Sequence, residues 1–213
     1  MKPGTSEDSL RTLQDIKSIM ERSARFLSLS GWSGIWAGSV ALAGTALAQY
    51  RLSQYYTAYN TGAGYENAAF ITLRNQLAML AAVVCIIAIA GGLYFTYRKN
   101  SESGERFWNN ASKRIMISLL IPLIAGGIMI LAFLRDNQWM YLVPVSLIFY
   151  GLALINGSKY TVSDIKYLGL LEVVLGCAAL ALPSAYGLYI WALGFGVLHI
   201  VYGLVMWQKY DRE

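Results

Sequence analysis

Two ionisable residues stand inside long apolar runs of this 213-residue chain. Glu172 is the only acid placed deep in such a run, and His199 is the only histidine. A charged side chain among apolar neighbours is costly unless it is paired, so such groups are candidates for ligand binding or proton transfer. Glycines surround both in the same frame: Gly169-x-x-Glu172-x-x-x-Gly176 and Gly196-x-x-His199-x-x-x-Gly203.

The depth of these groups follows from the helical rise of about 1.5 Å per residue. Glu172 lies roughly 9 Å beyond Lys166, and His199 lies roughly 15 Å before Lys209. Tyr202 is level with Glu172, so Glu172 has two contacts open to it: a hydrogen bond with Tyr202 or an ion pair with His199. The candidate residues of a ligand site or proton path are Glu172, His199, Tyr202 and Asn156.

The sequence lacks the parts of a catalyst. It has one histidine, no aspartate in the apolar runs and no cluster with metal-ligand spacing, so we predict no catalytic residue, no metal and no cofactor. Gly31-Trp32-Ser33-Gly34 is similar to the serine motif of rhomboid proteases. That serine lies on the first apolar run rather than the fourth, and the supporting histidine and asparagine are missing.

The composition predicts a polytopic membrane protein. Hydrophobic residues make up 56% of the chain and charged residues 14%, against about a quarter charged in soluble domains. About 20 apolar residues in a helix cross the hydrocarbon core, and continuous apolar runs favour helices over barrel strands. We expect an all-α fold of six transmembrane helices arranged as three hairpins, approximately Leu29–Ala48, Leu77–Tyr97, Ile115–Leu134, Met140–Asn156, Leu168–Pro183 and Leu188–Trp207.

The basic residues predict the orientation. With the N-terminus in the cytoplasm, all of the 17 lysines and arginines except Arg51, Arg74 and Arg135 lie on the cytoplasmic side. The positive-inside rule therefore favours a multi-pass protein of the cell (inner) membrane with both termini in the cytoplasm. Contacts with lipid headgroups account for the net charge of +5, and nothing else indicates nucleic-acid binding.

We expect the chain to consist of three parts. We expect an amphipathic cytoplasmic or interfacial helix in residues 1–28, the membrane domain in residues 29–207 and a cytoplasmic tail in residues 208–213. Two interpretations of residues 6–28 stay open: a helix lying on the membrane surface, or a docking helix for a cytosolic protein. The stretch from Tyr50 to about Gln76 is expected to be an outer loop.

Small residues predict how the helices pack. Glycines at these spacings let helix backbones approach closely in lipid. Aligning Gly38 with Gly176 sets Gly34 on Glu172, and Tyr150-Gly151-Leu152 repeats as Tyr202-Gly203-Leu204, which suggests an internal repeat. The predicted packing glycines are Gly31, Gly34, Gly38, Gly169, Gly176, Gly196 and Gly203.

The last hairpin, from Gly169 through Gly176 and Pro183 to Tyr202-Gly203, resembles the repeat unit of the HdeD-like (DUF308) family of small bacterial membrane proteins. In that family each helix pair has a glycine in its first helix, a proline at the outer turn and an isoleucine- or tyrosine-glycine near the end of its second helix. The resemblance implies a six-helix inner-membrane protein associated with stress resistance, and it carries over no catalytic residues.

The predicted function is that of a non-enzymatic integral membrane protein with a stress-related or sensory role and a buried Glu/His/Tyr cluster. The alternative is a small transporter or channel with a proton-linked path through Glu172 and His199. The cluster could also serve only to fix helix register. The expected partners are the lipid bilayer, a cytosolic protein at residues 6–28 and a second copy of the chain.

Overall fold

The computed structural model of the protein describes residues 11, 30–61, 67–102 and 110–211. All secondary structure in these residues is helical, which confirms the all-α class. The principal helices are α2 (Gly31–Asn60), α3 (Asn67–Glu102), α4 (Asn110–Arg135), α5 (Leu142–Gly157) and α6 (Ile165–Ala181). A last helix follows, composed of α7 (Gly187–Trp191), η4 (Ala192–Leu198), α8 (His199–Met206) and η5 (Trp207–Asp211), and short turns η1 (Trp139–Tyr141), η2 (Ser158–Tyr160) and η3 (Ser184–Tyr186) precede α5, α6 and α7.

Four helical stretches in the described residues are long and apolar enough to cross a membrane: Ala68–Glu102, Asn110–Arg135, Trp139–Tyr160 and Ser184–Tyr210. This is consistent with a membrane protein. α6 is not among them because it has only 17 residues. α2 is not among them either, and its apolar residues are interspersed with glycine, serine and tryptophan. The arrangement with six spans therefore stays a prediction.

The expected outer loop is wrong in its extent. α2 continues through the tyrosine-rich stretch to Asn60, and α3 begins at Asn67. The apolar pattern that predicted the first span ends near Ala48. The helix continues beyond it, since the following residues have no proline to interrupt it. The proposed helix in residues 6–28 lies outside the described residues apart from Arg11.

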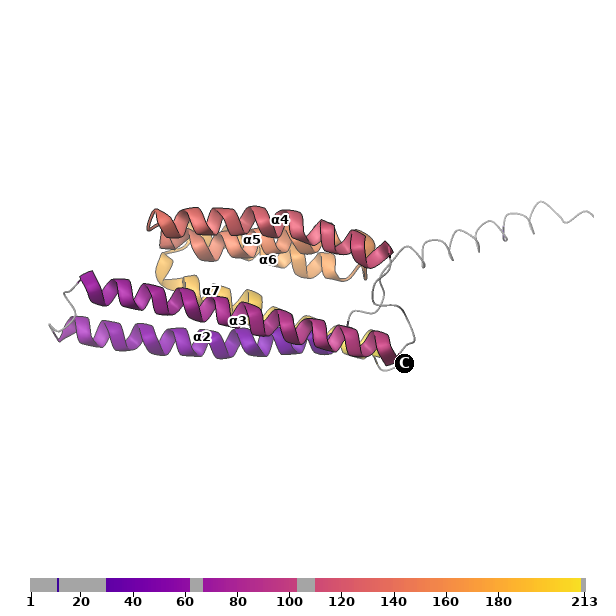
Figure 1. The fold of residues 1–213 in the computed structure, drawn as a ribbon, viewed down its shortest axis with the longest axis horizontal. Helices are drawn as coiled ribbons and strands as arrows, with labels where there is room; N and C mark the ends of the chain where they lie inside the picture. The colour runs from indigo at the N-terminus through magenta and orange to yellow at the C-terminus, as the bar shows by residue number, and fades with distance from the viewer. Residues whose placement is uncertain (1–10, 12–29, 62–66, 103–109, 212–213) are drawn as a thin grey trace, which may run out of the picture.

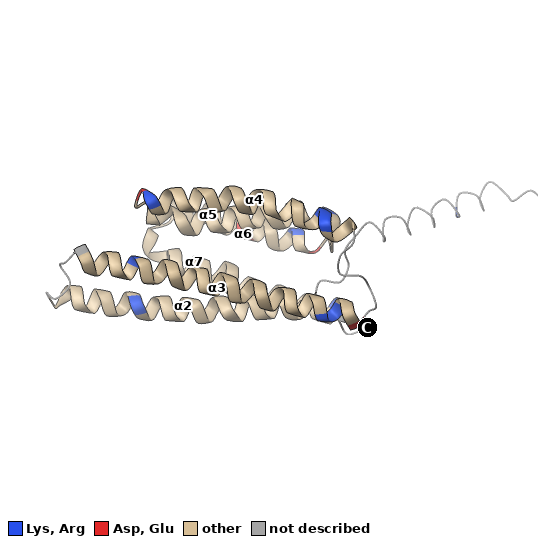
Figure 2. Ribbon diagram, in the orientation of Figure 1, with Lys and Arg blue, Asp and Glu red and all other residues tan. Residues whose placement is uncertain are grey.

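The helices lie side by side in two layers (Figure 1). One layer consists of α4, α5 and α6, and we call it the α4–α6 layer. The other consists of α2, α3 and the last helix, and we call it the α2 layer. Charged residues gather toward the two ends of the helices, and the middle of the bundle is almost free of them (Figure 2).

Each layer contains one close crossing of glycines. In the α4–α6 layer, a Cβ on Gly169 would lie 2.7 Å from the carbonyl oxygen of Gly151, and a Cβ on Gly176 would lie 2.9 Å from that of Pro144. Only glycine fits at such an approach. The α4–α6 layer is therefore held by direct backbone contact between α5 and α6.

The α2 layer repeats this geometry between α2 and the last helix. A Cβ on Gly31 would lie 2.6 Å from the carbonyl oxygen of Gly203, and a Cβ on Gly38 would lie 2.5 Å from that of Gly196. In both layers the paired positions are two helical turns apart. A Cβ on Gly34, which lies between them, would be 3.0 Å from the Cα of Gly203.

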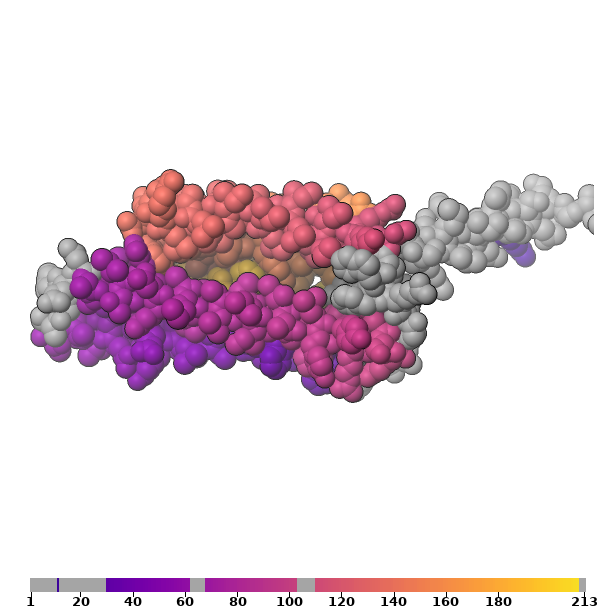
Figure 3. All heavy atoms as spheres, in the orientation of Figure 1, coloured from indigo at the N-terminus to yellow at the C-terminus, as the bar shows by residue number. Residues whose placement is uncertain are grey.

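α3 and α4 do not pack closely against each other in the described residues. Figure 3 shows a hollow between them, with atoms of the last helix at its floor. A Cβ on Gly92 of α3 or on Gly127 of α4 would meet nothing within 4 Å. The closest packing between the two layers is that of α7 and η4 against α5 and α6, and Arg74 of α3 adds a hydrogen bond to Asn137 at 2.6 Å.

Asn156 stabilises the helix that contains a proline. Pro122 lies inside α4 and has no backbone N–H, so the carbonyl of Ser118 loses its normal helical donor. The side-chain amide of Asn156 on α5 donates to that carbonyl at 2.9 Å. The predicted ligand candidate Asn156 thus bonds to α4, and its oxygen accepts from Lys159 at 3.3 Å.

Substituting Gly203 with alanine should destabilise the α2 layer by about 1–3 kcal/mol, because the added methyl meets backbone atoms that cannot move aside. Thermal unfolding in detergent, followed by helicity, measures the change. Gly127→Ala is the matched control: it meets no atom within 4 Å and gains helix propensity. Equal losses in both variants would show that the crossing does not depend on glycine.

Substituting Asn156 with leucine should destabilise the protein by about 1–2 kcal/mol, because the Ser118 carbonyl is left without a donor. The background variant Pro122→Ala restores a backbone N–H to that carbonyl, so the same substitution should then have little effect. A double-mutant cycle of thermal unfolding measures this coupling. Additive effects would contradict it.

Candidate functional site

Glu172 lies at the centre of the bundle with no exposed surface. Its carboxylate sits over Gly194 of the last helix, where a Cβ would lie 2.6 Å from Oε2 and 2.6 Å from Leu147 Cδ2. Neither carboxylate oxygen accepts a hydrogen bond from any group in the part of the chain that the structure describes. Within the part of the chain that the structure describes, its ion-pair neighbour is His199, with Nδ1 at 3.4 Å from Oε1.

His199 is 5% exposed and has two hydrogen-bonding partners. Nδ1 lies 3.0 Å from the carbonyl oxygen of Gly194, and Nε2 lies 2.8 Å from the hydroxyl of Tyr150. A carbonyl can only accept, so Nδ1 carries a hydrogen. In the neutral ring Nε2 is then the acceptor, and Tyr150 donates to it.

The π-helical turn of η4 positions the carbonyl of Gly194, which orients the imidazole of His199. Residues Ala192–Leu198 form a π-helical stretch, a wider turn that proteins often use at functional sites. Gly194 precedes His199 in this stretch, and its carbonyl accepts from the side chain of His199. The missing side chain of Gly194 also leaves room for the carboxylate of Glu172.

The cluster joins the two layers. Glu172 belongs to α6 and Tyr150 to α5, whereas His199 belongs to the last helix. Phe195 stacks on the same imidazole, with ring centroids 5.9 Å apart and an angle of 20°. His199 is consequently the residue through which α5 and α6 make polar contact with the α2 layer at this depth.

The structure brings together two of the four predicted site residues. Glu172 contacts His199 rather than Tyr202, whose hydroxyl is buried and has no hydrogen-bond partner among the described residues. Asn156 lies against α4. The sequence interpretation missed Tyr150 as a member of the site, although its match to Tyr202 in the suggested repeat could have indicated it.

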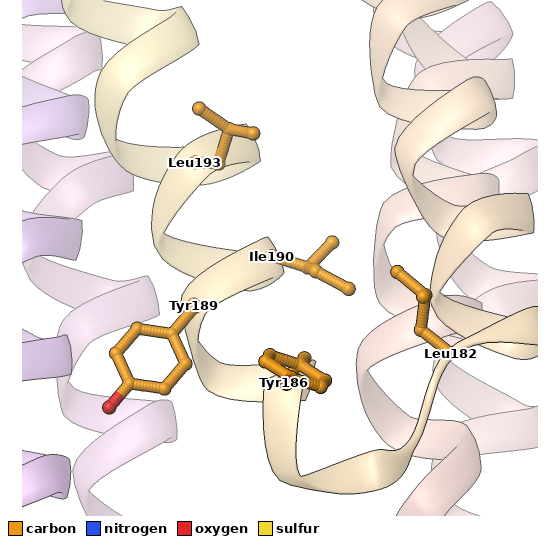
Figure 4. Close-up of a pocket in the computed structure, with 5 residues that line it drawn as sticks. All are labelled: Leu182, Tyr186, Tyr189, Ile190 and Leu193. Carbon is orange, nitrogen blue, oxygen red and sulfur yellow. The ribbon is translucent and has the colours of Figure 1, made fainter.

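The pocket drawn in Figure 4 lies away from the cluster, at the turn between α6 and α7. It has a volume of about 350 Å³ and is lined by Leu182, Tyr186, Tyr189, Ile190 and Leu193. Leu182, directly after the end of α6, faces Ile190 of the last helix across it (Figure 4). Its surface is apolar, so it offers no continuation of the polar cluster toward that end.

No family model, no curated protein and no solved structure matches the chain. Within the described residues no three histidine, cysteine, aspartate or glutamate side chains are grouped as a metal site would require. The chemistry of the cluster must therefore be inferred from its own geometry.

Substituting Gly194 with alanine should displace the carboxylate of Glu172 and alter the environment of the imidazole. Because the chain has one histidine, ¹⁵N-histidine NMR of a protein without a histidine tag reports on His199 alone. Gly187→Ala on the same helix is the control, since its nearest added contact is 3.7 Å away. An unchanged His199 spectrum in Gly194→Ala would contradict this geometry.

Proposed function

We propose that the protein is a non-enzymatic, six-helix integral membrane protein that senses acid through the Glu172–His199 pair. The observation that supports this is a carboxylate that is fully buried, has no hydrogen-bond donor among the described residues and lies 3.4 Å from an imidazole. An isolated carboxylate in such surroundings is strongly unfavourable. A proton is the smallest group that neutralises it.

The pair is neutral when it holds one proton. That proton resides either on Glu172, beside a neutral imidazole, or on His199, as an ion pair. In both arrangements the bundle carries no net charge at this depth. A second proton gives the pair a net positive charge, which the surrounding hydrocarbon does not tolerate.

The second proton also changes the hydrogen bonds of the imidazole. Both ring nitrogens of a protonated histidine are donors, so Tyr150 can no longer donate to Nε2 and must accept from it. The contacts that join the layers are thereby weakened together. Each layer remains held by its own glycine crossing, and the layers therefore separate as units on acidification.

The alternative, a small transporter or channel through Glu172 and His199, needs a polar path to both ends of the bundle. The apolar pocket at the outer turn favours sensing over transport. The resemblance of the last hairpin to a stress-associated family agrees with a sensory role. A cytosolic partner at residues 6–28 would be the natural recipient of the signal.

The native thiols provide a measurement of layer separation. Cys177 is on α6 and Cys85 is on α3, one in each layer, and both are exposed. We expect the distance between spin labels on them to change by about 1–2 Å or more between neutral and acidic pH. His199→Gln should abolish this change, because the variant cannot take up the second proton.

The substitution Glu172→Gln distinguishes an acid sensor from a proton-linked transporter. It leaves His199 able to gain a proton, so a sensor should still respond to acid, whereas a transporter should lose pH-dependent uptake in proteoliposomes. Glu102→Gln, an exposed change at the end of α3, is the control for loss of a carboxylate. A wild-type label distance that is independent of pH would refute acid sensing.

A further inference from the structure

The hollow between α3 and α4 is a feature of the bundle that the Glu172–His199 cluster does not involve. It lies on the face of the molecule drawn in Figure 3, and atoms of the last helix form its floor. Its two walls are apolar helices: of the most apolar stretch of each, only 6% in α3 and 11% in α4 is buried inside the bundle. An apolar hollow that opens toward hydrocarbon loses dispersion contacts if it stays empty, so a membrane component should fill it.

α3 presents small side chains to the α4–α6 layer. Arg74 near the start of α3 bonds to Asn137, which follows α4, so this side of α3 faces that layer. Residues at helical spacing from Arg74 share the same side. They are Ala78, Ala81, Cys85, Ala88, Gly92 and Thr96. None of them has a long side chain, and a Cβ on Gly92 would meet nothing within 4 Å, so α3 leaves the space unfilled.

Side chains bridge the two walls at one end. Arg74 Nη1 donates to Asn137 Oδ1 at 2.6 Å, and the guanidinium lies 5.9 Å from the centre of the Trp139 ring. A transmembrane helix of a second copy would run the full length of α3 and α4 and would have to displace this bridge. A lipid enters from one leaflet, and its acyl chain crosses about half of the hydrocarbon core of about 30 Å. A lipid therefore fills the hollow without breaking the bridge.

The opposite end of the two walls is basic. α3 finishes just after Arg98 and Lys99, and α4 begins just before Lys113 and Arg114 (Figure 2). From Arg98 to Arg114 the sequence has five basic residues against two acids. A second copy in the same orientation would bring two such ends together, whereas the phosphate of a lipid headgroup is attracted to them. The charge at this end therefore favours an anionic lipid over a second copy of the chain.

We propose that the hollow between α3 and α4 binds one anionic phospholipid. Its phosphate lies at the basic end of α3 and α4, and an acyl chain extends along the small side chains of α3, past Gly92 and toward the Arg74 bridge. Three observations support this occupant: the apolar hollow, the bridge at one end and the excess of basic residues at the other. The inference does not depend on acid sensing by the Glu172–His199 pair.

Native mass spectrometry of the full chain in detergent, with phosphatidylglycerol and phosphatidylcholine of the same acyl chains added together, tests the proposal. We expect one phosphatidylglycerol to bind in preference to phosphatidylcholine. Gly92→Leu puts a side chain into the hollow, and its Cβ meets no protein atom within 4 Å. It should weaken phosphatidylglycerol binding about tenfold or more, because each methylene that it displaces accounts for roughly a fourfold change. Ala90→Leu, on the opposite side of α3 and exposed, is the control and should bind as the wild type does.

A charge variant tests the headgroup end and adds no bulk, so it is independent of any effect of Gly92→Leu on folding. Lys113→Gln should weaken phosphatidylglycerol binding about fivefold and leave phosphatidylcholine unaffected. Lys166→Gln on α6, which α5 separates from α4, is its control and should not change binding. Equal binding of the two lipids by the wild type, or wild-type binding in Gly92→Leu or Lys113→Gln, would overturn the proposal. A dimer that is lost in Gly92→Leu would also overturn it, because the occupant would then be a second copy.

Discussion

The burial of one carboxylate constrains the whole bundle. Glu172 has no exposed surface and no hydrogen-bond donor within the described residues, and removing such a group from water is expensive. His199 is the one side chain within ion-pair distance, and it is held by Gly194 and Tyr150. The position of the last helix against α6 therefore depends on the contact between Glu172 and His199.

Close backbone contacts hold the helices together within each layer, and side-chain contacts join one layer to the other. Glycine crossings are short, dry and without ionisable groups, so the α5–α6 and α2–α8 contacts do not respond to pH. Polar contacts between the layers are the Glu172–His199–Tyr150 cluster, the Asp164–Lys209 bond and a hydrogen bond from Arg74 of α3 to Asn137, which follows α4; the first of these contains the buried Glu–His pair. Rigid layers with a titratable contact between them favour movement of whole layers over local unfolding.

Long apolar runs and glycine spacing were enough to predict the all-α class, because helices that lie in hydrocarbon need apolar side chains, and helices that cross closely need small residues. They also marked Glu172 and His199. The match of Tyr150 to Tyr202 could have indicated it as a candidate, but the direction of its side chain depends on the crossing of α5 with α6, which the sequence does not give. The acceptor carbonyl of Gly194 depends on the π-helical stretch, for which we found no local residue signal. The bond of Asn156 to α4 could not be predicted, because its partner is a carbonyl freed by Pro122 on another helix.

The suggested repeat allows Glu172 and His199 to be compared with the residues at the corresponding positions of other helices. In the alignment that sets Gly176 on Gly38 and Gly151 on Gly203, Gly34 is the counterpart of Glu172 and Leu147 is the counterpart of His199. Those counterparts are apolar and closely packed, and Leu147 is wholly buried. The same helix positions can thus be filled without any ionisable group. Packing at these positions does not require an ionisable group, and this supports the proposal that the glutamate and histidine form a contact that responds to protons.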